Sequence, residues 1–238
     1  MKRLSPVSRI LALALLVGMA ASPAAADIII DDFTVGVTLT LNSGSSGTVQ
    51  DSVAAPVLGG FTEFSATKNN DAGTLVITTT PGVYDYASSS VPAGGSATIT
   101  WDGVNNNALD TTGLGGGFDL TGGGTNNAFA GVLRGDDSPG AAMTITVWTG
   151  GVPSSAVIPI PDSLSFTPFS AAFSSFSGSP NFANVGAIRV QFNGTPNQDF
   201  QFDAFRVTGP TAAVPEPSSL SLLGFGAVAL FLRRRRQS

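Results

Sequence analysis

Hydrophobic and polar residues alternate with a period of two in several short stretches of the chain. In one of them, Ile188, Val190 and Phe192 alternate with polar neighbours, as expected for a strand with one buried face. A similar, less regular pattern occupies residues 199–207. Because residues 193–197 are the turn formers Asn-Gly-Thr-Pro-Asn, we expect these two strands to form a hairpin.

The rest of the chain repeats this organisation. Runs rich in Val, Ile, Thr and Phe are separated by Gly, Ser, Thr and Asn. The clearest predicted strands are 75–80, 97–101, 128–133, 143–149, 185–192 and 199–207. Even spacing and the lack of a convincing helix predict an all-β fold, a β-sandwich or jelly roll. The segment from Phe166 to Phe182 contains Pro168 and Pro180, so we expect an irregular crossing segment that packs its rings into the core.

The last residues combine a short motif, an apolar run and a basic cluster. The motif consists of Val214, Pro215, Glu216 and Pro217, and the cluster of Arg233, Arg234, Arg235 and Arg236. Between them, the apolar run 220–232 forms a helix of about 20 Å, short against a bilayer core of about 30 Å. We therefore expect one short transmembrane helix within 218–238, with the arginines in the cytoplasm. The prolines keep 211–217 extended as a tether.

This order of features resembles the PEP-CTERM signal of bacterial surface proteins. The resemblance covers residues 214–236 and implies recognition by a membrane-embedded exosortase, which cuts near the Pro-Glu-Pro motif. An ordinary C-terminal anchor is the alternative. The family occurs in bacteria that make exopolysaccharide, so the implied destination is the cell surface or the extracellular matrix.

The N-terminal end also indicates export. A basic start precedes an apolar run over 10–20 and small residues at Ala24 and Ala26. These features predict a signal peptide over residues 1–26, removed by signal peptidase so that the mature chain begins at Asp27. An uncleaved signal anchor is the alternative. Residues 27–210 are then expected to form one β-sandwich domain.

Composition excludes several functions. Between Asp27 and Glu216 lie all 16 acidic residues of the chain but only four basic ones, a net charge of −12 (4 minus 16). Such a surface repels phosphate backbones, so we expect no binding to nucleic acid. The chain contains no cysteine and no histidine. Disulfides, Ser-His-Asp and Cys-His catalysis and the usual zinc sites are therefore excluded.

A second resemblance concerns the domain itself. The segments Ile30–Phe33 and Phe202–Val207 resemble the first and last strands of galactose-binding-like jelly rolls, which lie side by side. Two further segments, Gly113–Leu120 and Asn184–Ile188, resemble segments that recur in PEP-CTERM proteins with such a body. The likeness implies the fold. Ala204 departs from it, because an asparagine or aspartate usually follows the buried aspartate.

Three aspartates are candidate metal ligands. Asp31 and Asp32, lying near Asp203, would hold a structural Ca²⁺ together with backbone carbonyls, since Ca²⁺ needs only oxygen ligands. The alternative is that one aspartate caps a strand end and the others are solvated. No other cofactor is expected.

Exposed aromatic side chains are candidate sugar-stacking groups. Tyr84 and Tyr86 share one face of a strand, as a small platform or as ordinary core residues. Trp148 lies on the same face as Thr144 and Thr146, which makes it the best candidate for an exposed binding aromatic.

These features predict a non-enzymatic exported surface or matrix protein. A carbohydrate-binding module for exopolysaccharide is the alternative. A hydrolase would need two close carboxyls in a cleft, and no spacing selects a pair. The acidic candidates for such a pair are Glu63, Asp85, Asp102 and Asp119.

Overall fold

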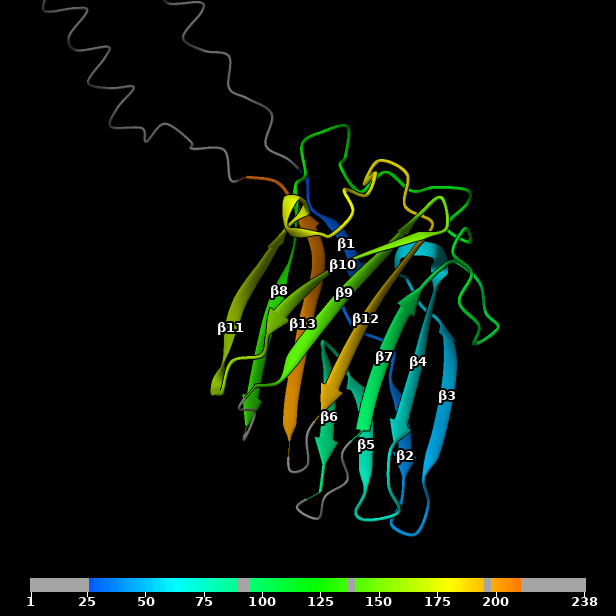
Figure 1. Cartoon of the computed structure of the whole chain (residues 1–238), viewed down its shortest axis with the longest axis vertical. Helices are drawn as coiled ribbons and strands as arrows, with labels where there is room; N and C mark the ends of the chain where they lie inside the picture. Colours follow the sequence, from blue (N-terminus) through cyan, green and yellow to red (C-terminus); the bar gives the residue numbers. More distant parts are fainter. Residues whose placement is uncertain (1–25, 90–94, 137–139, 195–197, 211–238) are drawn as a thin grey trace, which may run out of the picture. The chain divides into compact units, whose positions relative to one another are not determined.

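The domain consists of β-strands in two layers. The computed structural model describes residues 26–210 except 90–94, 137–139 and 195–197, so the predicted signal peptide, tether and transmembrane helix lie outside the described residues. All strand pairings within the two sheets are antiparallel, and the only helical elements described are the 3₁₀ turns η1 (Leu58–Gly60) and η2 (Phe173–Ser175) (Figure 1). The expected all-β sandwich is confirmed.

We call the two layers sheet A and sheet B. Sheet A has the order β11-β8-β13-β6-β5-β2, with β1 paired to β13, and sheet B has the order β10-β9-β12-β7-β4-β3. The strands of sheet A are β1 (Ile28–Asp31), β2 (Val37–Leu41), β5 (Leu75–Thr80), β6 (Val83–Ser88), β8 (Ala128–Asp136), β11 (Ser163–Ala172) and β13 (Asp199–Thr208). Those of sheet B are β3 (Gly47–Ala54), β4 (Phe61–Lys68), β7 (Gly95–Trp101), β9 (Ala142–Thr149), β10 (Val152–Pro159) and β12 (Ala187–Gly194).

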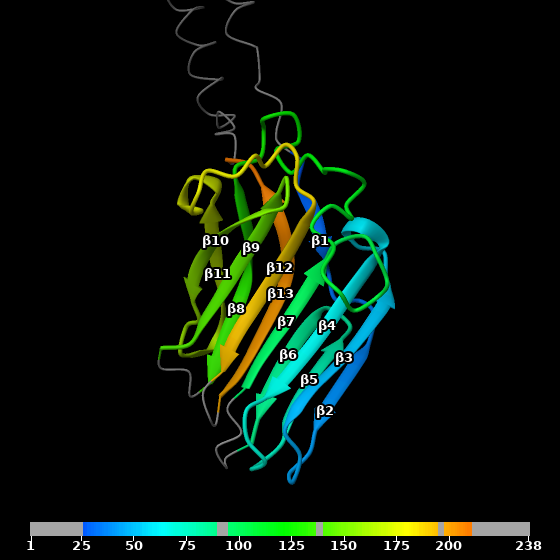
Figure 2. The ribbon, with the colours of Figure 1, turned by 45° about the vertical axis from the view of Figure 1, so that its right-hand side comes forward.

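The core lies between the inner faces of the two sheets (Figure 2). Alternation puts every second side chain there, as in β2, where Val37, Leu39 and Leu41 are buried and the two threonines between them are exposed. Aromatic rings fill the centre, for example Tyr84 stacked on Phe192 with ring centroids 5.4 Å apart. The other faces of the sheets carry polar residues and point outward, so they are the surfaces open to ligands.

Prolines mark the two neighbouring edges of the sandwich. Pro153 and Pro159 lie in β10, the edge strand of sheet B, and Pro168 lies in β11, the edge strand of sheet A. A proline cannot donate to a strand ladder, so an edge strand tolerates it. Segment 163–172 is therefore a strand, and the expected irregular crossing segment is wrong for these residues.

The phenylalanine rings within β11 and those that follow it differ in burial. Phe166 in β11 is 40% exposed, whereas Phe176 and Phe182 are buried. Beyond the strand, Phe173 stacks on Phe182 with ring centroids 3.8 Å apart. The expected packing of rings into the core thus holds for residues 173–182 and not for Phe166.

The expected hairpin between residues 185–192 and 199–207 is also wrong. β12 pairs with β7 and β9 in sheet B, whereas β13 pairs with β1, β6 and β8 in sheet A. The connection therefore crosses from one layer to the other. Turn residues predict a reversal of the chain, and they do not determine which sheet the following strand joins.

The first and last strands lie side by side, as the jelly-roll resemblance implies. Ile28 of β1 lies opposite Val207 of β13, so the described chain enters and leaves the domain at the same end (Figure 1). Within the described residues, no helix is long and apolar enough to cross a membrane.

The glycine-rich loop 113–120 packs against residues 184–186. Phe118 and Val185 exchange two backbone hydrogen bonds of 2.8 and 3.0 Å, and Leu114 N donates to Gly186 O at 3.0 Å. A Cβ on Gly117 would lie 1.4 Å from Asn184 Oδ1. The two segments singled out by the PEP-CTERM resemblance therefore contact each other, and the φ of +137° at Gly117 favours glycine where they meet.

Candidate functional site

A row of polar side chains crosses the outer face of sheet B. In the strand register Thr146 lies opposite Arg189, Arg189 opposite Thr100, and Thr100 opposite Glu63. These positions belong to β9, β12, β7 and β4, and they alternate with buried core residues. Strand alternation thus gathers these polar side chains in a strip on the outer face, where Thr146 and Arg189 are half-buried and Thr100 and Glu63 are buried.

Arg189 and Trp148 form the aromatic end of this strip. The guanidinium carbon of Arg189 lies 5.6 Å from the centroid of the Trp148 ring, and Arg189 Nε donates to Thr100 Oγ1 at 3.1 Å. A cation over an indole face at this distance is attracted by the ring. The expectation that Trp148 lies on the polar, outward face is confirmed, and its side chain is half-buried.

Glu63 forms the acidic end of the strip. Its Oε1 accepts hydrogen bonds from the backbone N–H groups of Asn106 at 3.2 Å and Asn107 at 2.7 Å. Burial raises the pKa of this carboxyl, and the nearby charge of Asp102 acts in the same direction. The loop after β7 therefore holds a partly desolvated carboxylate beside the arginine.

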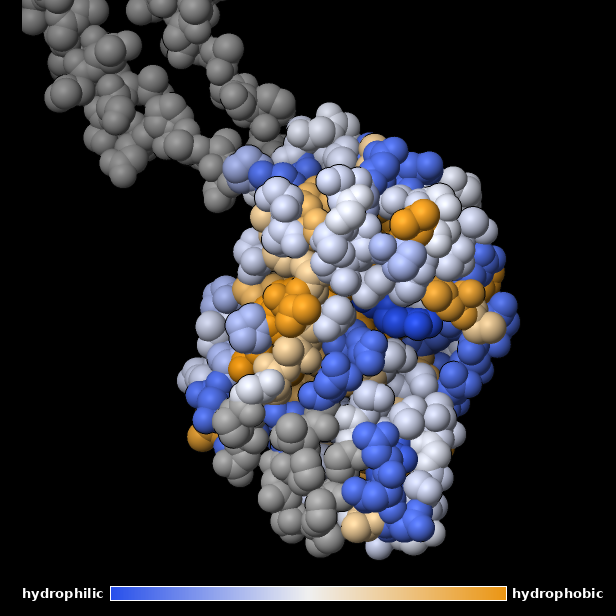
Figure 3. Space-filling model, in the orientation of Figure 1, coloured by the Kyte–Doolittle hydropathy of each residue, from blue (hydrophilic) through white to orange (hydrophobic). Residues whose placement is uncertain are grey.

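A cavity of about 240 Å³ lies on this strip. Figure 3 shows this face of the molecule, with hydrophilic residues gathered over its middle and hydrophobic ones toward the β10 side. Among the residues that line the cavity are Gln50, Glu63, Ser65, Thr98, Asn107 and Arg189. Amide, hydroxyl, carboxylate and guanidinium groups beside an aromatic ring suit a ligand that is rich in hydroxyl groups.

Tyr84 and Tyr86 do not belong to this surface, so their prediction as a sugar platform is wrong. Both lie on the inner face of β6 and are fully buried. Tyr86 stacks on Phe200 with ring centroids 4.4 Å apart, and burial raises its pKa to about 12. The two tyrosines share one face, as expected, but that face belongs to the core.

Asp31 is a buried hydrogen-bond acceptor that joins the two sheets. Its Oδ2 accepts from Trp101 Nε1 at 2.9 Å and from Thr62 Oγ1 at 2.8 Å, and its Oδ1 accepts from Phe33 N at 2.7 Å. Burial raises the pKa of Asp31, and these donors oppose the shift. Both carboxylate oxygens are thus used within the core.

The other two predicted calcium ligands bond locally. Asp32 accepts from the backbone N–H and hydroxyl of Thr34, and Asp203 from the backbone N–H of Ala204. Across the described ranges, no three acidic side chains gather into a group that would hold a metal ion. Calcium binding by Asp31, Asp32 and Asp203 together with backbone carbonyls stays a prediction for direct measurement.

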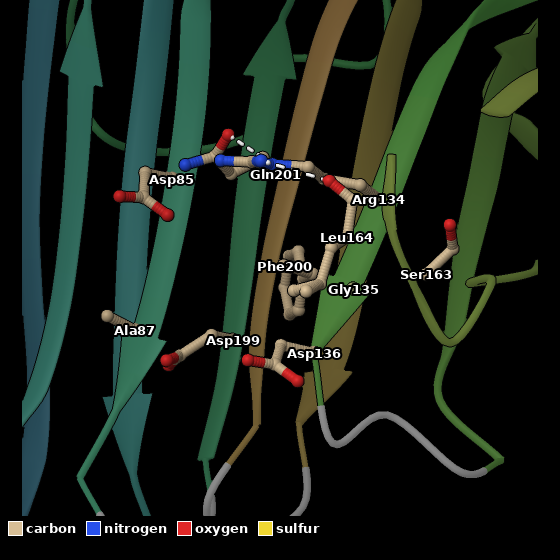
Figure 4. A pocket seen from close by; sticks show the side chains of 10 residues that line it. All are labelled: Asp85, Ala87, Arg134, Gly135, Asp136, Ser163, Leu164, Asp199, Phe200 and Gln201. Carbon is tan, nitrogen blue, oxygen red and sulfur yellow. Dashed lines mark hydrogen bonds between the residues drawn. The ribbon is translucent and has the colours of Figure 1, made fainter. Parts of the chain in front are cut away.

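A second cavity, of about 250 Å³, lies on the outer face of sheet A, and the sequence alone did not indicate it. Figure 4 shows Arg134 extending above Phe200 toward Gln201 and Asp85. Arg134 Nε donates to Gln201 Oε1 at 2.7 Å, and its Nη1 donates to the carbonyl of Leu164 at 3.1 Å. The signal available in the sequence was the scarcity of basic residues, which makes each outward arginine notable.

Ala26 and Asp27, on either side of the predicted signal-peptide cleavage, belong to the described residues. The carbonyl of Ala26 accepts from Asn126 Nδ2 at 3.1 Å, and Asp27 Oδ2 lies 3.2 Å from Arg206 Nε. The residues of the predicted processing sites that lie outside the described residues are Ala24, Val214, Pro215, Glu216, Pro217, Arg233, Arg234, Arg235 and Arg236. Their predicted roles follow from the sequence alone.

The fold and the two outer faces define an all-β sandwich protein with polar cavities on both sheets. Residues 213–236 match the family described as the PEP-CTERM protein-sorting motif. The chain therefore carries a PEP-CTERM sorting signal, which implies export and membrane anchoring before processing by an exosortase. No curated protein sequence matches the chain.

Solved structures to which this chain is similar include carbohydrate-binding modules. The family 11 module of the cellulosomal cellulase Lic26A-Cel5E of Clostridium thermocellum is 14% identical, with 79% of this chain and 97% of that chain covered and a TM-score of 0.40. A carbohydrate-binding module of family 29 is 9% identical, with 78% of this chain and 98% of that chain covered and a TM-score of 0.33.

Proposed function

We propose that this chain is a non-enzymatic surface or matrix protein that a signal peptidase and an exosortase process at its two ends. The exosortase cuts near Pro215–Pro217, and the β-sandwich is then released or transferred to the cell surface. The match to the PEP-CTERM motif over residues 213–236 carries this proposal.

The ends of the domain agree with such processing. The last strand ends at Thr208, and only residues 209–212 separate it from the matched motif. The first strand begins at Ile28, and β1 lies beside the end of β13. Neither cleavage would remove a strand of either sheet.

Intact mass of the protein from its producing cells tests this proposal. We expect loss of residues 1–26 and of the segment after the Pro-Glu-Pro motif, and a strain without the exosortase keeps the C-terminal segment. Any additional mass would identify a group attached on transfer. An intact C-terminal segment in both strains would mean that the tail is a simple anchor.

A specific observation supports a second function, binding of exopolysaccharide by the outer face of sheet B. Trp148, Arg189 and Glu63 lie along one strip beside a cavity. An aromatic face stacks on a sugar ring, while the arginine and the carboxylate bind its hydroxyl groups. Retardation of the full chain in a gel containing the producing strain's exopolysaccharide is the expected result, and migration equal to that in a plain gel would contradict it.

A further inference from the structure

We propose that the cavity on the outer face of sheet A is a second saccharide site, which takes a neutral hexopyranose unit, so that the domain holds two polysaccharide chains on opposite faces. The two-chain arrangement rests on the glycan binding proposed for sheet B. The sheet A site itself stands on separate residues from β6, β8, β13 and β11.

The two outward arginines are held in the same way. Arg134 lies over the ring of Phe166 at 5.1 Å, and Arg189 lies over the ring of Trp148 at 5.6 Å. Each donates from Nε to a neutral side-chain oxygen on a neighbouring strand, of Gln201 and of Thr100 respectively. Each also lines a cavity of about 240 to 250 Å³. Both guanidinium groups are thus oriented by the fold, which lowers the entropy lost when a ligand binds.

The other two basic side chains between residues 27 and 216, Lys68 and Arg206, already have partners within the domain. Lys68 is buried and donates to the carbonyls of Asn42 and Gly73. Arg206 pairs with Asp27, the one ion pair found in the described part of the chain. In a body with a net charge of −12 (4 minus 16), two arginines therefore lie over aromatic rings and bond to neutral oxygens, and both lie at cavities.

The lining of the sheet A cavity fits hydroxyl groups. Arg134 supplies donors and Asp85 supplies acceptors within one space, with Gln201 between them in the strand register (Figure 4). A hydroxyl group donates and accepts at once, so neighbouring hydroxyls of a pyranose satisfy both kinds of group. Leu164, 70% exposed, offers an apolar contact for the C–H face of the ring.

Charge argues against anionic ligands at this site. Asp136 and Asp199 lie opposite each other on neighbouring strands, and Asp85 lines the same cavity. Three carboxylates around one guanidinium repel a uronate or a phosphate group. A neutral sugar avoids this repulsion.

The two cavities serve different polymer chains. Asp85 and Gln201 point outward from sheet A, while their strand neighbours Tyr84 and Phe202 are buried in the core. The sheets of a sandwich pack about 10 Å apart, and the core between them separates the two outer faces. A sugar chain bound on one face does not pass through to the other.

Two binding measurements on the full chain test the proposal. Affinity electrophoresis in gels of mixed-linkage β-glucan, galactomannan or dextran identifies the neutral polymer that retards the protein, with alginate as the acidic comparison. Calorimetry with an oligosaccharide of that polymer then gives the stoichiometry. We expect two sites in the native chain, and one site in each of Arg134→Gln and Arg189→Gln, because losing a hydrogen bond from a charged donor weakens binding roughly tenfold or more.

Arg206→Gln is the matched control, since it removes the same charge outside both cavities. If the native chain has one site and Arg134→Gln leaves that site unchanged, the sheet A site is refuted and the sheet B proposal stands. A single site lost only in Arg134→Gln would overturn the sheet B proposal instead. Retardation by alginate alone, or by none of the polymers, would refute a neutral sugar ligand, and unchanged melting temperatures would exclude misfolding as the cause.

Discussion

Trp101 Nε1 donates a 2.9 Å hydrogen bond to Asp31 Oδ2, and this buried contact joins sheet B to the first strand of sheet A. Thr62 of β4 donates to the same oxygen. Two strands of one layer are thus fixed to β1 of the other. The position of β1 beside the last strand depends on this carboxylate as well as on its own ladder.

Replacing Asp31 should therefore be costly. Asp31→Ala leaves the buried donors of Trp101, Thr62 and Phe33 without their acceptor, and we expect the free energy of unfolding to fall by about 3 kcal/mol or more. Denaturant unfolding measures this change. Asp32→Ala, which removes a carboxylate bonded only to Thr34, is the control and should cost well under 1 kcal/mol.

Tyr84→Phe should stabilise the domain. The Tyr84 hydroxyl is buried without a hydrogen-bond partner, so removing it relieves a desolvation cost of about 1 to 2 kcal/mol. Tyr86→Phe removes a hydroxyl that has a weak 3.5 Å contact with the carbonyl of Gly95, and it should change stability little. A rise in melting temperature for the first variant alone is the expected result, and equal losses in both would mean that Tyr84 has a partner.

Gly186→Ala should disturb the loops over sheet B. A Cβ there would lie 2.1 Å from the backbone carbonyl oxygen of Thr111, a contact that requires the backbone to move. We expect a loss of about 1 to 3 kcal/mol in unfolding free energy. Gly36→Ala, whose Cβ would lie an ordinary 3.5 Å from Thr79 O, is the control. Equal stability of the two variants would show that the loop yields freely.

Exchanges at Trp148 and Arg189 should weaken glycan binding without weakening the fold. Trp148→Ala removes the stacking face, and Arg189→Lys keeps the charge but loses the planar fork that lies over the ring. Both side chains lie outside the core, so melting temperatures should stay within a few degrees of the native value. Affinity for the polysaccharide that retards the native chain should fall roughly tenfold in each variant, a loss of about 1.4 kcal/mol in binding free energy. Unchanged affinity in both variants would place the binding surface elsewhere.

Mild acid should stabilise the domain. The pKa values of Asp31, Glu63, Asp85 and Asp203 are all raised, with burial as the largest cause. A carboxyl whose pKa is higher in the folded state contributes stability that is present below its unfolded pKa and is lost as pH rises through the folded value. Unfolding free energy should therefore increase as pH falls from 7 toward the unfolded pKa of a carboxyl, about 4, and falling net charge acts in the same direction.

Asp110 and Asp119 act against this rise in stability on acidification. Hydrogen bonds from Thr112 and Thr121 lower the pKa values of Asp110 and Asp119, which are exposed. Glu63→Gln keeps an oxygen acceptor for the loop after β7 and removes one carboxyl with a raised pKa. The unfolding free energy of this variant should therefore rise less on acidification than that of the native chain. A domain that loses stability between pH 7 and pH 5 would contradict the prediction.

Local sequence patterns predicted several of the strands and the sorting motif. Period-two alternation is a local property, so β5, β7, β9 and the outward face of Trp148 followed from it. The sorting motif is likewise a continuous segment of sequence, so it was identified without the folded structure.

The sheet that each strand joins and the face that it buries depend on long-range packing. β12 and β13 belong to different sheets instead of forming a hairpin, and the shared face of Tyr84 and Tyr86 belongs to the core. Alternation gives two faces without saying which one meets the other sheet. Arg134 and Arg189 come to their cavities through partners more than 60 residues away in the chain, and such long-range pairing leaves no local pattern in the sequence.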